Sequence, residues 1–296
     1  MSLLSPPSLD AIYSIASSED STWAKWLKRL KNRGLATVLI CLLGLLLWAL
    51  LAPWFAQDPH AQNLQATLRA PGTEHRLGTD HLGRDVLARL AEAVRVSLGL
   101  ALGSSALAVI LGCGLGLLAA WRGGWADRAC CLLADAVCAI PALLWVLLIA
   151  ALAPGEKWAL YSGLVLTAWV EFFRFVRPTA QGVLAGQQVQ ASRLLGFGAA
   201  HVLRWHVWPP IAGSLLTLWS YAVANAVLAL AALGFVGIGI RPPIAELGLM
   251  MTEALPYYAQ APWLLAAPVM LLVGVVMLLQ ALARRLGGDM QAGGLL

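Results

Sequence analysis

The sequence has few charged residues. Only 12% of its 296 residues are Asp, Glu, Lys or Arg, whereas 60% are hydrophobic and the mean hydropathy is +0.75. A soluble domain carries about 25% charged residues, so the composition predicts an integral membrane protein with several spans. The net charge of +5 is modest. The basic residues lie beside apolar runs, as in membrane proteins generally, so we expect no nucleic-acid partner.

Motifs for covalent chemistry are also missing. The only lysines are Lys25, Lys28, Lys31 and Lys157, and none ends the glycine-rich loop G-x-x-x-x-G-K-[ST] that binds ATP phosphates. Neither H-E-x-x-H nor G-x-S-x-G occurs, and no carboxylate pair has a catalytic spacing. We therefore predict no catalytic residue, no enzymatic activity and no cofactor bound by this chain.

Cysteine and histidine give little indication of a metal site. The five cysteines lie within or beside apolar runs without metal-ligand spacing, which predicts small hydrophobic side chains. His60, His75 and His81 share one polar stretch, where a weak metal site is an alternative to three solvated side chains. Solvated histidines are the simpler interpretation, because proximity in sequence does not set coordination geometry.

Long apolar runs predict an all-α, polytopic protein with six transmembrane helices, because a span needs about 20 apolar residues. The first run is too long for the core of a cleaved signal peptide, which has about 7 to 15 residues, so we interpret it as a true span. The predicted spans cover approximately residues 35–55, 96–121, 129–153, 158–176, 211–239 and 263–283. Residues 56–95 form a loop outside the cell membrane, and residues 96–285 form a five-helix core.

Basic residues predict the orientation of the chain. A cluster before the first span places residues 1–34 in the cytoplasm as a tail without periodicity. The other basic residues are more numerous on that same side of a six-span arrangement, so residues 286–296 form a second cytoplasmic tail. The N-terminal cluster consists of Lys25, Lys28, Arg29, Lys31 and Arg33.

The predicted spans contain a few polar residues and many glycines. Asp135 is interpreted as an anchor between helices or to an inner loop, with a proton relay as the weaker alternative. Glu171 can pair with Arg174 at i, i+3, and the mid-span Asn225 can bond another helix or line a pore. Small residues in the second predicted span allow close helix contacts; they are Gly99, Gly103, Gly112, Gly114 and Gly116.

The loop before the second span contains the stretch LGTDHLGRDVLARL, from which we define residues 78–85 as the outer motif. Its glycines permit tight turns, and its aspartates can cap helix starts or pair with Arg84 or Arg89. Arg89 follows Asp85 by four residues, a favourable spacing for an ion pair. A structural turn and cap is preferred over direct contact with a substrate. The residues concerned are Gly78, Thr79, Asp80, Gly83, Arg84 and Asp85.

Residues 187–210, on the predicted inner side, combine two arginines and two histidines with a divided apolar pattern. Gly196 and Gly198 separate two short helical halves. Apolar residues recur three and four apart, which suits helices with one apolar face. Such helices lie along a membrane surface as ordinary connectors or dock into a groove of a partner protein.

Both segments resemble motifs of binding-protein-dependent ABC importer permeases. The pattern G-T-D-x-x-G-R-D is typical of the dipeptide, oligopeptide and nickel branch. Residues 187–210 resemble that family's EAA loop, which docks into the ATPase subunit, and we call them the coupling segment. The matching residues, all expected to serve ATPase coupling, are Gln190, Ala191, Ser192, Arg193, Leu194, Gly196, His206 and Pro209. Gln190 and Ser192 depart from the usual acid and alanine.

The resemblance implies an ABC type I importer permease fold with a cytoplasmic coupling helix, in the bacterial inner membrane. It implies a second permease subunit, two ATPase subunits that bind the ATP, and a periplasmic or lipid-anchored substrate-binding protein. Peptides are the expected substrates, and nickel or a metal chelate is the alternative. A gradient-driven secondary transporter or channel, or a membrane scaffold, is the rival from another class. A secondary transporter would need paired intramembrane charges, for which only Asp135 and Glu171 are candidates.

Overall fold

The computed structural model describes residues 33–55 and 57–291, and helices are its only regular elements. Residues 1–32 of the predicted tail, with most of its basic cluster, lie outside the described residues. Inside lipid, backbone N–H and C=O groups must bond within the protein, and a helix satisfies nearly all of its own. The all-α prediction is confirmed.

Five helical stretches are long and apolar enough to cross a membrane. They are α2 (Arg33–Phe55), α3 (Val86–Arg122), α6 (Lys157–Leu184), the stretch from α8 (Ala199–Val202) through η2 (Leu203–Val207) to α9 (Trp208–Phe235), and α11 (Pro262–Gln291). The remaining elements are η1 (Leu64–Ala66), α4 (Gly124–Cys138), α5 (Ala142–Leu152), α7 (Gln187–Leu194), α10 (Leu247–Ala254) and η3 (Leu255–Tyr257).

The third predicted span is broken. Its place is taken by α4 and α5, which meet at an angle of 78°, so the count is five spans, or six if the bent pair is one. The break lies at Pro141, which precedes α5 with an extended backbone and interrupts the helix because proline has no N–H to donate. Residues before a proline also avoid helical geometry.

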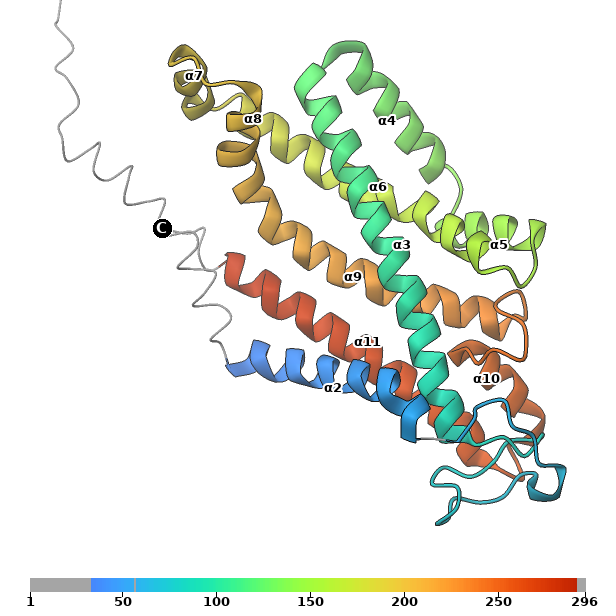
Figure 1. Cartoon of the computed structure of the whole chain (residues 1–296). Coiled ribbons are helices and arrows are strands. Elements are labelled where there is room, and N and C mark those ends of the chain that lie inside the picture. Colours follow the sequence, from blue (N-terminus) through green and yellow to red (C-terminus); the bar gives the residue numbers. More distant parts are fainter. Residues whose placement is uncertain (1–32, 56, 292–296) are drawn as a thin grey trace, which may run out of the picture.

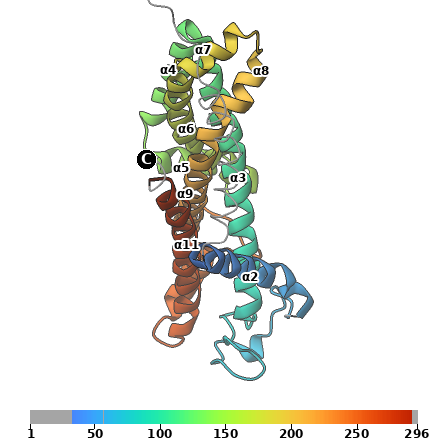
Figure 2. The ribbon, with the colours of Figure 1, turned by 90° about the vertical axis from the view of Figure 1, so that its left-hand side faces the viewer.

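The helices form an elongated bundle in which α3 packs along α6, and α9 packs on α11. The first span, α2, contacts only the edge formed by α3 and α11, and it crosses the bundle in Figure 2. Figure 1 shows α7 and α8 at one end of the molecule and α10, with the loop that precedes α3, at the opposite end. The coupling segment and the outer motif are therefore far apart.

Three helix ends differ from the sequence prediction. The second span was expected to begin near Val96, but α3 begins at Val86 because the Asp85 side chain caps its first turn. Residues 86–95 are therefore helix instead of loop. The helix α9 ends at Phe235 because Gly237, with φ of 83°, turns the chain. The last helix continues to Gln291, so residues 286–291 are helical and not a tail.

Glycines bring α3 and α6 together. A Cβ atom on Gly112 would lie 2.4 Å from the carbonyl oxygen of Trp169, and one on Gly116 would lie 3.0 Å from Val176. Gly103 is similarly close to Tyr161, whose hydroxyl donates to the Gly103 carbonyl. Gly99 and Gly114, in contrast, would meet nothing within 4 Å. The prediction that glycines allow close helix contacts is thus confirmed for one face of α3 and wrong for the other.

This difference provides a matched pair of variants. We expect Gly112→Ala to destabilise the protein by about 1–3 kcal/mol through overpacking. Gly114→Ala, two residues away, should be neutral or stabilise the helix by up to about 1 kcal/mol. Thermal unfolding of the detergent-solubilised chain would measure both. Equal melting temperatures for the two variants would contradict the α3–α6 contact described here.

Candidate functional site

The outer motif is a tight double turn that only glycine permits at two positions. Gly78 and Gly83 have φ of 75° and 72°, a region that other residues rarely adopt. A Cβ atom on Gly83 would lie 1.8 Å from the carbonyl oxygen of Asn63, and one on Gly78 would lie 2.4 Å from that of Arg69. The motif therefore folds closely onto the preceding part of its own loop.

Thr79 and Asp80 bind this turn together. The buried Thr79 hydroxyl donates to the Ala66 carbonyl and accepts the backbone N–H of Arg69 at 3.0 Å. The Asp80 carboxylate accepts the backbone N–H groups of Leu82 and Arg84, each at 2.9 Å. The motif is thus a network of buried bonds, which is the structural role preferred from the sequence.

Asp80 also pairs with two buried arginines. Its Oδ2 atom lies 2.6 Å from Arg84 Nε and 2.6 Å from Arg89 Nη1. Burial by itself raises the pKa of Asp80. The backbone N–H of Arg84 and the positive charges of Arg89 and Arg84 outweigh burial, however, and hold the pKa of this carboxyl below its usual range.

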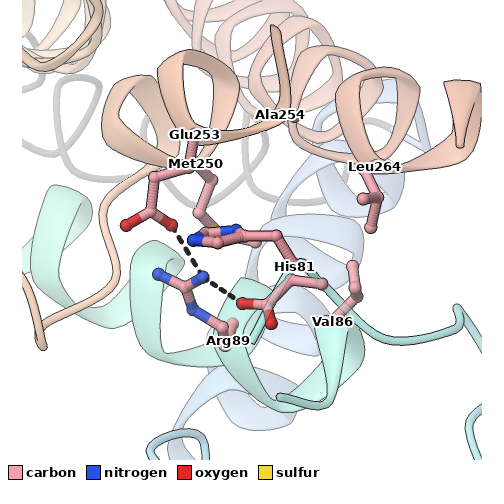
Figure 3. Close-up of a pocket in the computed structure, with 8 residues that line it drawn as sticks. His81, Val86, Arg89, Met250, Glu253, Ala254 and Leu264 are labelled. Atoms are coloured by element: carbon pink, nitrogen blue, oxygen red, sulfur yellow. Dashed lines mark hydrogen bonds and ion pairs between the residues drawn. The ribbon is translucent and has the colours of Figure 1, made fainter. Parts of the chain in front are cut away.

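Glu253 of α10 completes the cluster and was missed by sequence reasoning. Its Oε2 atom accepts from Arg89 Nη1 at 2.8 Å (Figure 3). The same atom accepts from Arg84 Nη2 at 3.2 Å. Two acids and two bases therefore form a neutral group that joins the outer motif and the start of α3 to α10. More than 160 residues separate the partners, so no local spacing signals this contact.

Asp85 has a different role from the one predicted by its spacing. It accepts the backbone N–H of Ala88 at 2.8 Å, which caps α3, and its other oxygen lies 2.8 Å from His75 Nδ1. Its expected ion pair with Arg89 is not found among the described residues, because Arg89 points toward Asp80 and Glu253. The capping prediction is confirmed and the pairing prediction is wrong.

The three loop histidines do not form a metal site. His60 lies 3.3 Å from Glu92, His75 contacts Asp85, and His81 stacks on Tyr257 at 5.4 Å. Among the described residues, one group could geometrically hold an ion: Asp80, His81 and Glu253, with ligand atoms within 4.8 Å of one another. Two arginines already neutralise both carboxylates of this group, so its donor set does not suit a cation.

At the opposite end, the coupling segment consists of two short helices, as predicted. Gly196, with φ of 83°, separates α7 from α8, and η2 then leads into α9 with the wider turn of a π-helix. Val189, Val202 and Val207 are buried in the apolar cluster that includes α6. Leu194 faces outward and is 90% exposed.

The eight predicted coupling residues fall into two groups. Ser192 is buried, and its hydroxyl lies 2.8 Å from His206 Nε2, so this pair holds α7 against η2. A ring stack of Phe197 on His201 at 4.2 Å closes the turn between the helices. The remaining residues are exposed and available to a partner: Gln190, Ala191, Arg193, Leu194, Gly196 and Pro209.

Two of these exposed residues also make contacts within the chain. The Gln190 amide donates to the Ala185 carbonyl at 3.3 Å. The Arg193 guanidinium lies 5.4 Å from the ring centre of Trp121, at the end of α3. The position of α7 is therefore linked to α3 as well as to α6 and η2.

The polar residues within spans form two contacts between α4 and α6. Arg174 donates to Asp135 at 3.0 Å, which is the inter-helix contact expected for Asp135. Arg177 Nη2 donates to Asp127 Oδ2 at 2.6 Å, and Arg177 Nε donates to Asp127 Oδ1. Both arginines of α6 therefore bind α4.

Glu171 and Asn225 remain outside these contacts. Both are exposed in the isolated chain. The predicted pairing of Glu171 with Arg174 is not found in the part of the chain that the structure describes, where Arg174 turns to Asp135. Asn225 makes no hydrogen bond among the described residues, so the inter-helix bond expected for it is not found there.

An all-helical membrane bundle with an exposed coupling segment at one end and a polar network at the other defines an importer permease subunit. The chain belongs to the family of binding-protein-dependent transport system inner membrane components, whose model matches residues 93–290. It is a multi-pass inner-membrane permease subunit of the ABC importer type that works with ATPase and binding-protein partners, and its relatives include peptide and nickel permeases. The chain is thus a transport subunit, with neither catalytic activity nor a cofactor of its own.

Several relatives cover most of the chain. It is 35% identical over 275 residues to the di/tripeptide transport system permease protein DppC of Pseudomonas aeruginosa, covering 89% of this chain and 88% of that one. The identity is 30% over 250 residues to the oligopeptide permease OppC of Bacillus subtilis (84% and 82% covered). It is 33% over 257 residues to the nickel permease NikC of Escherichia coli K12 (86% and 90% covered).

A solved structure has the same fold. The inward-facing MetNI methionine ABC transporter matches with a TM-score of 0.50 and 19% sequence identity, over 68% of this chain and 95% of that chain. At this identity the match shows the fold alone. It confirms the predicted permease fold.

Removing Asp80 tests whether the outer motif is structural. Because Asp80→Ala leaves two buried arginines short of a partner, we expect it to destabilise the chain by about 3–5 kcal/mol and to reduce assembly. Asp85→Ala removes a helix cap and should cost about 1 kcal/mol. Thermal unfolding and recovery of partner subunits would measure these effects.

The exposed Glu74, which lies 3.5 Å from Arg69, provides the control, and Glu74→Ala should change neither stability nor assembly. An Asp80→Ala chain that assembles fully but no longer supports uptake would instead favour direct contact with the substrate.

Proposed function

We propose that this chain forms one half of a translocation pathway for peptides and is coupled to ATPase subunits through residues 187–210. Its partners are a second permease subunit, two ATPase subunits and a periplasmic or lipid-anchored binding protein. Both termini lie in the cytoplasm, on the side of the coupling segment. We place the boundaries between the segments of the chain at the ends of helices, so that the permease core starts with α3.

The construction of the coupling segment is the observation that carries this proposal. Leu194 and Leu195 are 90% and 76% exposed, although α7 is fixed by buried valines and by the Ser192–His206 bond. A rigidly held apolar surface at a helical end is suited to docking into a groove of a partner. The chain then continues from α7 through α8 and η2 into α9, so that a displacement of the exposed surface is transmitted to the middle of the bundle.

Peptide is favoured over nickel by the chemistry of the chain. A groove of about 290 Å³ between α3 and α9 is lined by Ile110, Trp208, Trp219 and smaller apolar residues. None of its lining residues is a metal ligand, and the outer Asp80–His81–Glu253 group is neutralised by arginines. Apolar surface suits the side chains of peptides, whereas a nickel path would expose imidazole, thiolate or carboxylate groups.

The decisive experiment is a pull-down of the tagged chain in mild detergent, followed by reconstitution with whatever it recovers. We expect a second permease and Walker-motif ATPases, and ATP-dependent uptake of labelled di- or oligopeptides into vesicles. Uptake of nickel without peptide uptake would replace the substrate assignment. Recovery of the chain alone, with uptake driven by a proton gradient without ATP, would support a secondary transporter instead.

Coupling predicts a specific pair of variants. Arg193→Ala combined with Leu194→Ala removes exposed side chains without opening the core, so insertion and stability should persist. Since central interface residues often contribute more than about 1 kcal/mol each, we expect ATPase binding to weaken roughly tenfold or more and uptake to fall with it. The matched control is Leu132→Ala, which removes another exposed leucine, on α4.

Gly196→Pro tests the turn itself. Proline fixes φ near −65°, whereas Gly196 has φ of 83°, so the turn between α7 and α8 cannot keep its shape. The variant should insert normally yet fail to transport. Wild-type uptake by Gly196→Pro or by the double variant would refute the assignment of the coupling segment.

A further inference from the structure

The short helix α10 is held differently at its two ends. At its start, Glu246 is buried and its Oε2 accepts the backbone N–H of Leu249 at 3.0 Å as a helix cap. A Cβ atom on Gly248 would lie 1.9 Å from the Ala231 carbonyl oxygen, and one on Gly234 would lie 2.1 Å from Glu246 Oε2. This end is packed directly on the backbone of α9, with no space for water.

Bonds to α3 further fix the start of α10. The backbone N–H of Ala245 donates to Glu92 at 3.2 Å, and the Ser97 hydroxyl lies 3.4 Å from Glu246 Oε1. Burial raises the pKa of Glu246, although the backbone N–H groups of α10 counteract it in part. This end thus behaves as a fixed point between α3 and α9.

The other end of α10 is held mainly by charge. Glu253 binds Arg89 through its Oε2 atom (Figure 3). The same oxygen binds Arg84, and nearby Tyr257 stacks on His81. The Glu253 side chain is 17% exposed, whereas each arginine side chain is 2% exposed. Water therefore reaches the glutamate more readily than its partners.

Breaking this contact would not leave the arginines without a counter-charge. Arg84 and Arg89 each keep Asp80 at 2.6 Å, on the same side of the interface. Removing a charge from a buried pair is costly because its partner is left unpaired. Here the cost is reduced, since the remaining group of Asp80 and two arginines stays intact while Glu253 meets solvent.

Arg89 is also only partly satisfied in this arrangement. Its side chain is buried, yet Nε and Nη2 have no hydrogen-bond partner in the described part of the chain. Beside it lies a cavity of about 20 Å³, lined by Asp80, His81, Arg89, Glu253 and apolar residues, which is room for one water molecule. An incompletely bonded cluster with space for water can exchange a carboxylate for water at lower cost than a closed one.

We propose that Glu253 is a latch residue, which holds the end of α10 against the outer motif and releases it during transport while the start of α10 remains a pivot on α9. This inference rests on the proposed function of the chain. It assigns Glu253 a positioning role at the outer end of the translocation pathway, beside the outer motif. In this proposal α9 connects the coupling segment to the pivot, and the Glu253 contact determines whether the outer end of the pathway is open.

The first test compares Glu253→Gln with Glu253→Asp in the reconstituted complex, with the exposed Glu74→Gln as control. Coupling between sites usually corresponds to about 5- to 150-fold. We therefore expect the Glu253→Gln complex to assemble and to hydrolyse ATP without the binding protein. The stimulation of its ATP hydrolysis by the binding protein should be at least about fivefold smaller than in the wild type. Glu253→Asp should restore part of it, and Glu74→Gln should match the wild type.

Unchanged stimulation and uptake in an assembled Glu253→Gln complex would overturn the latch. Equal losses of assembly in Glu253→Gln and Glu253→Asp would also overturn the latch. Such a result would show a packing role that does not depend on the negative charge, which Glu253→Asp keeps. Absence of ATP-dependent uptake in the wild-type complex would instead refute the proposed function, so the two failures are distinguishable.

A second test does not depend on removing the charge. His81→Cys combined with Tyr257→Cys places two thiols on the residues whose rings stack, so that a short reducible thiol cross-linker can tether the end of α10. We expect uptake to fall severalfold on cross-linking and to recover on reduction, with each single-cysteine variant unaffected. Normal uptake by the cross-linked protein would show that α10 does not need to move.

Discussion

The fold depends on how helices attract one another where water is absent. Lipid chains are as apolar as leucine, so burying apolar surface gives no drive for association, and close backbone contact must supply it. The α3–α6 pair, the largest contact in the bundle, achieves this by placing Gly112 and Gly116 against the α6 backbone. The same device recurs where Gly248 meets the backbone of α9. Glycine thus makes the closest of these helix contacts possible.

Charged groups have a complementary role at the ends of the bundle. Asp127 and Asp135 bind arginines of α6 and keep the α4 arm of the bent pair in place. At the opposite end, Asp80 and Glu253 balance two buried arginines. Glycine contacts need exact fit and tolerate little movement, whereas ion pairs near water can exchange partners. The permease therefore combines close backbone contacts between its helices with ion pairs near both ends of the bundle.

Local patterns predicted the features that depend on nearby residues. Apolar length predicted the spans, Asp85 was recognised as a helix cap, and Gly196 was recognised as the division between two short helices. The failures concern partners distant in sequence. Spacing favoured pairs of Asp85 with Arg89 and of Glu171 with Arg174, but the fold offered these arginines acids from other segments. Glu253 gave no signal because its partners lie more than 160 residues earlier in the sequence. The bend at Pro141 was missed because hydropathy continues through it.

The π-helical turn η2 has a consequence for the direction in which the coupling segment faces. A residue in an α-helix advances the chain by about 100° around the axis, and a π turn accommodates one residue more than an α turn. The five residues Leu203–Val207 therefore shift the angular phase between α8 and α9. If these five residues adopted α-helical geometry, the surface that carries Leu194 would rotate about the axis of α9 by roughly a right angle. A single turn of helix thus sets the azimuth at which the coupling segment projects from α9.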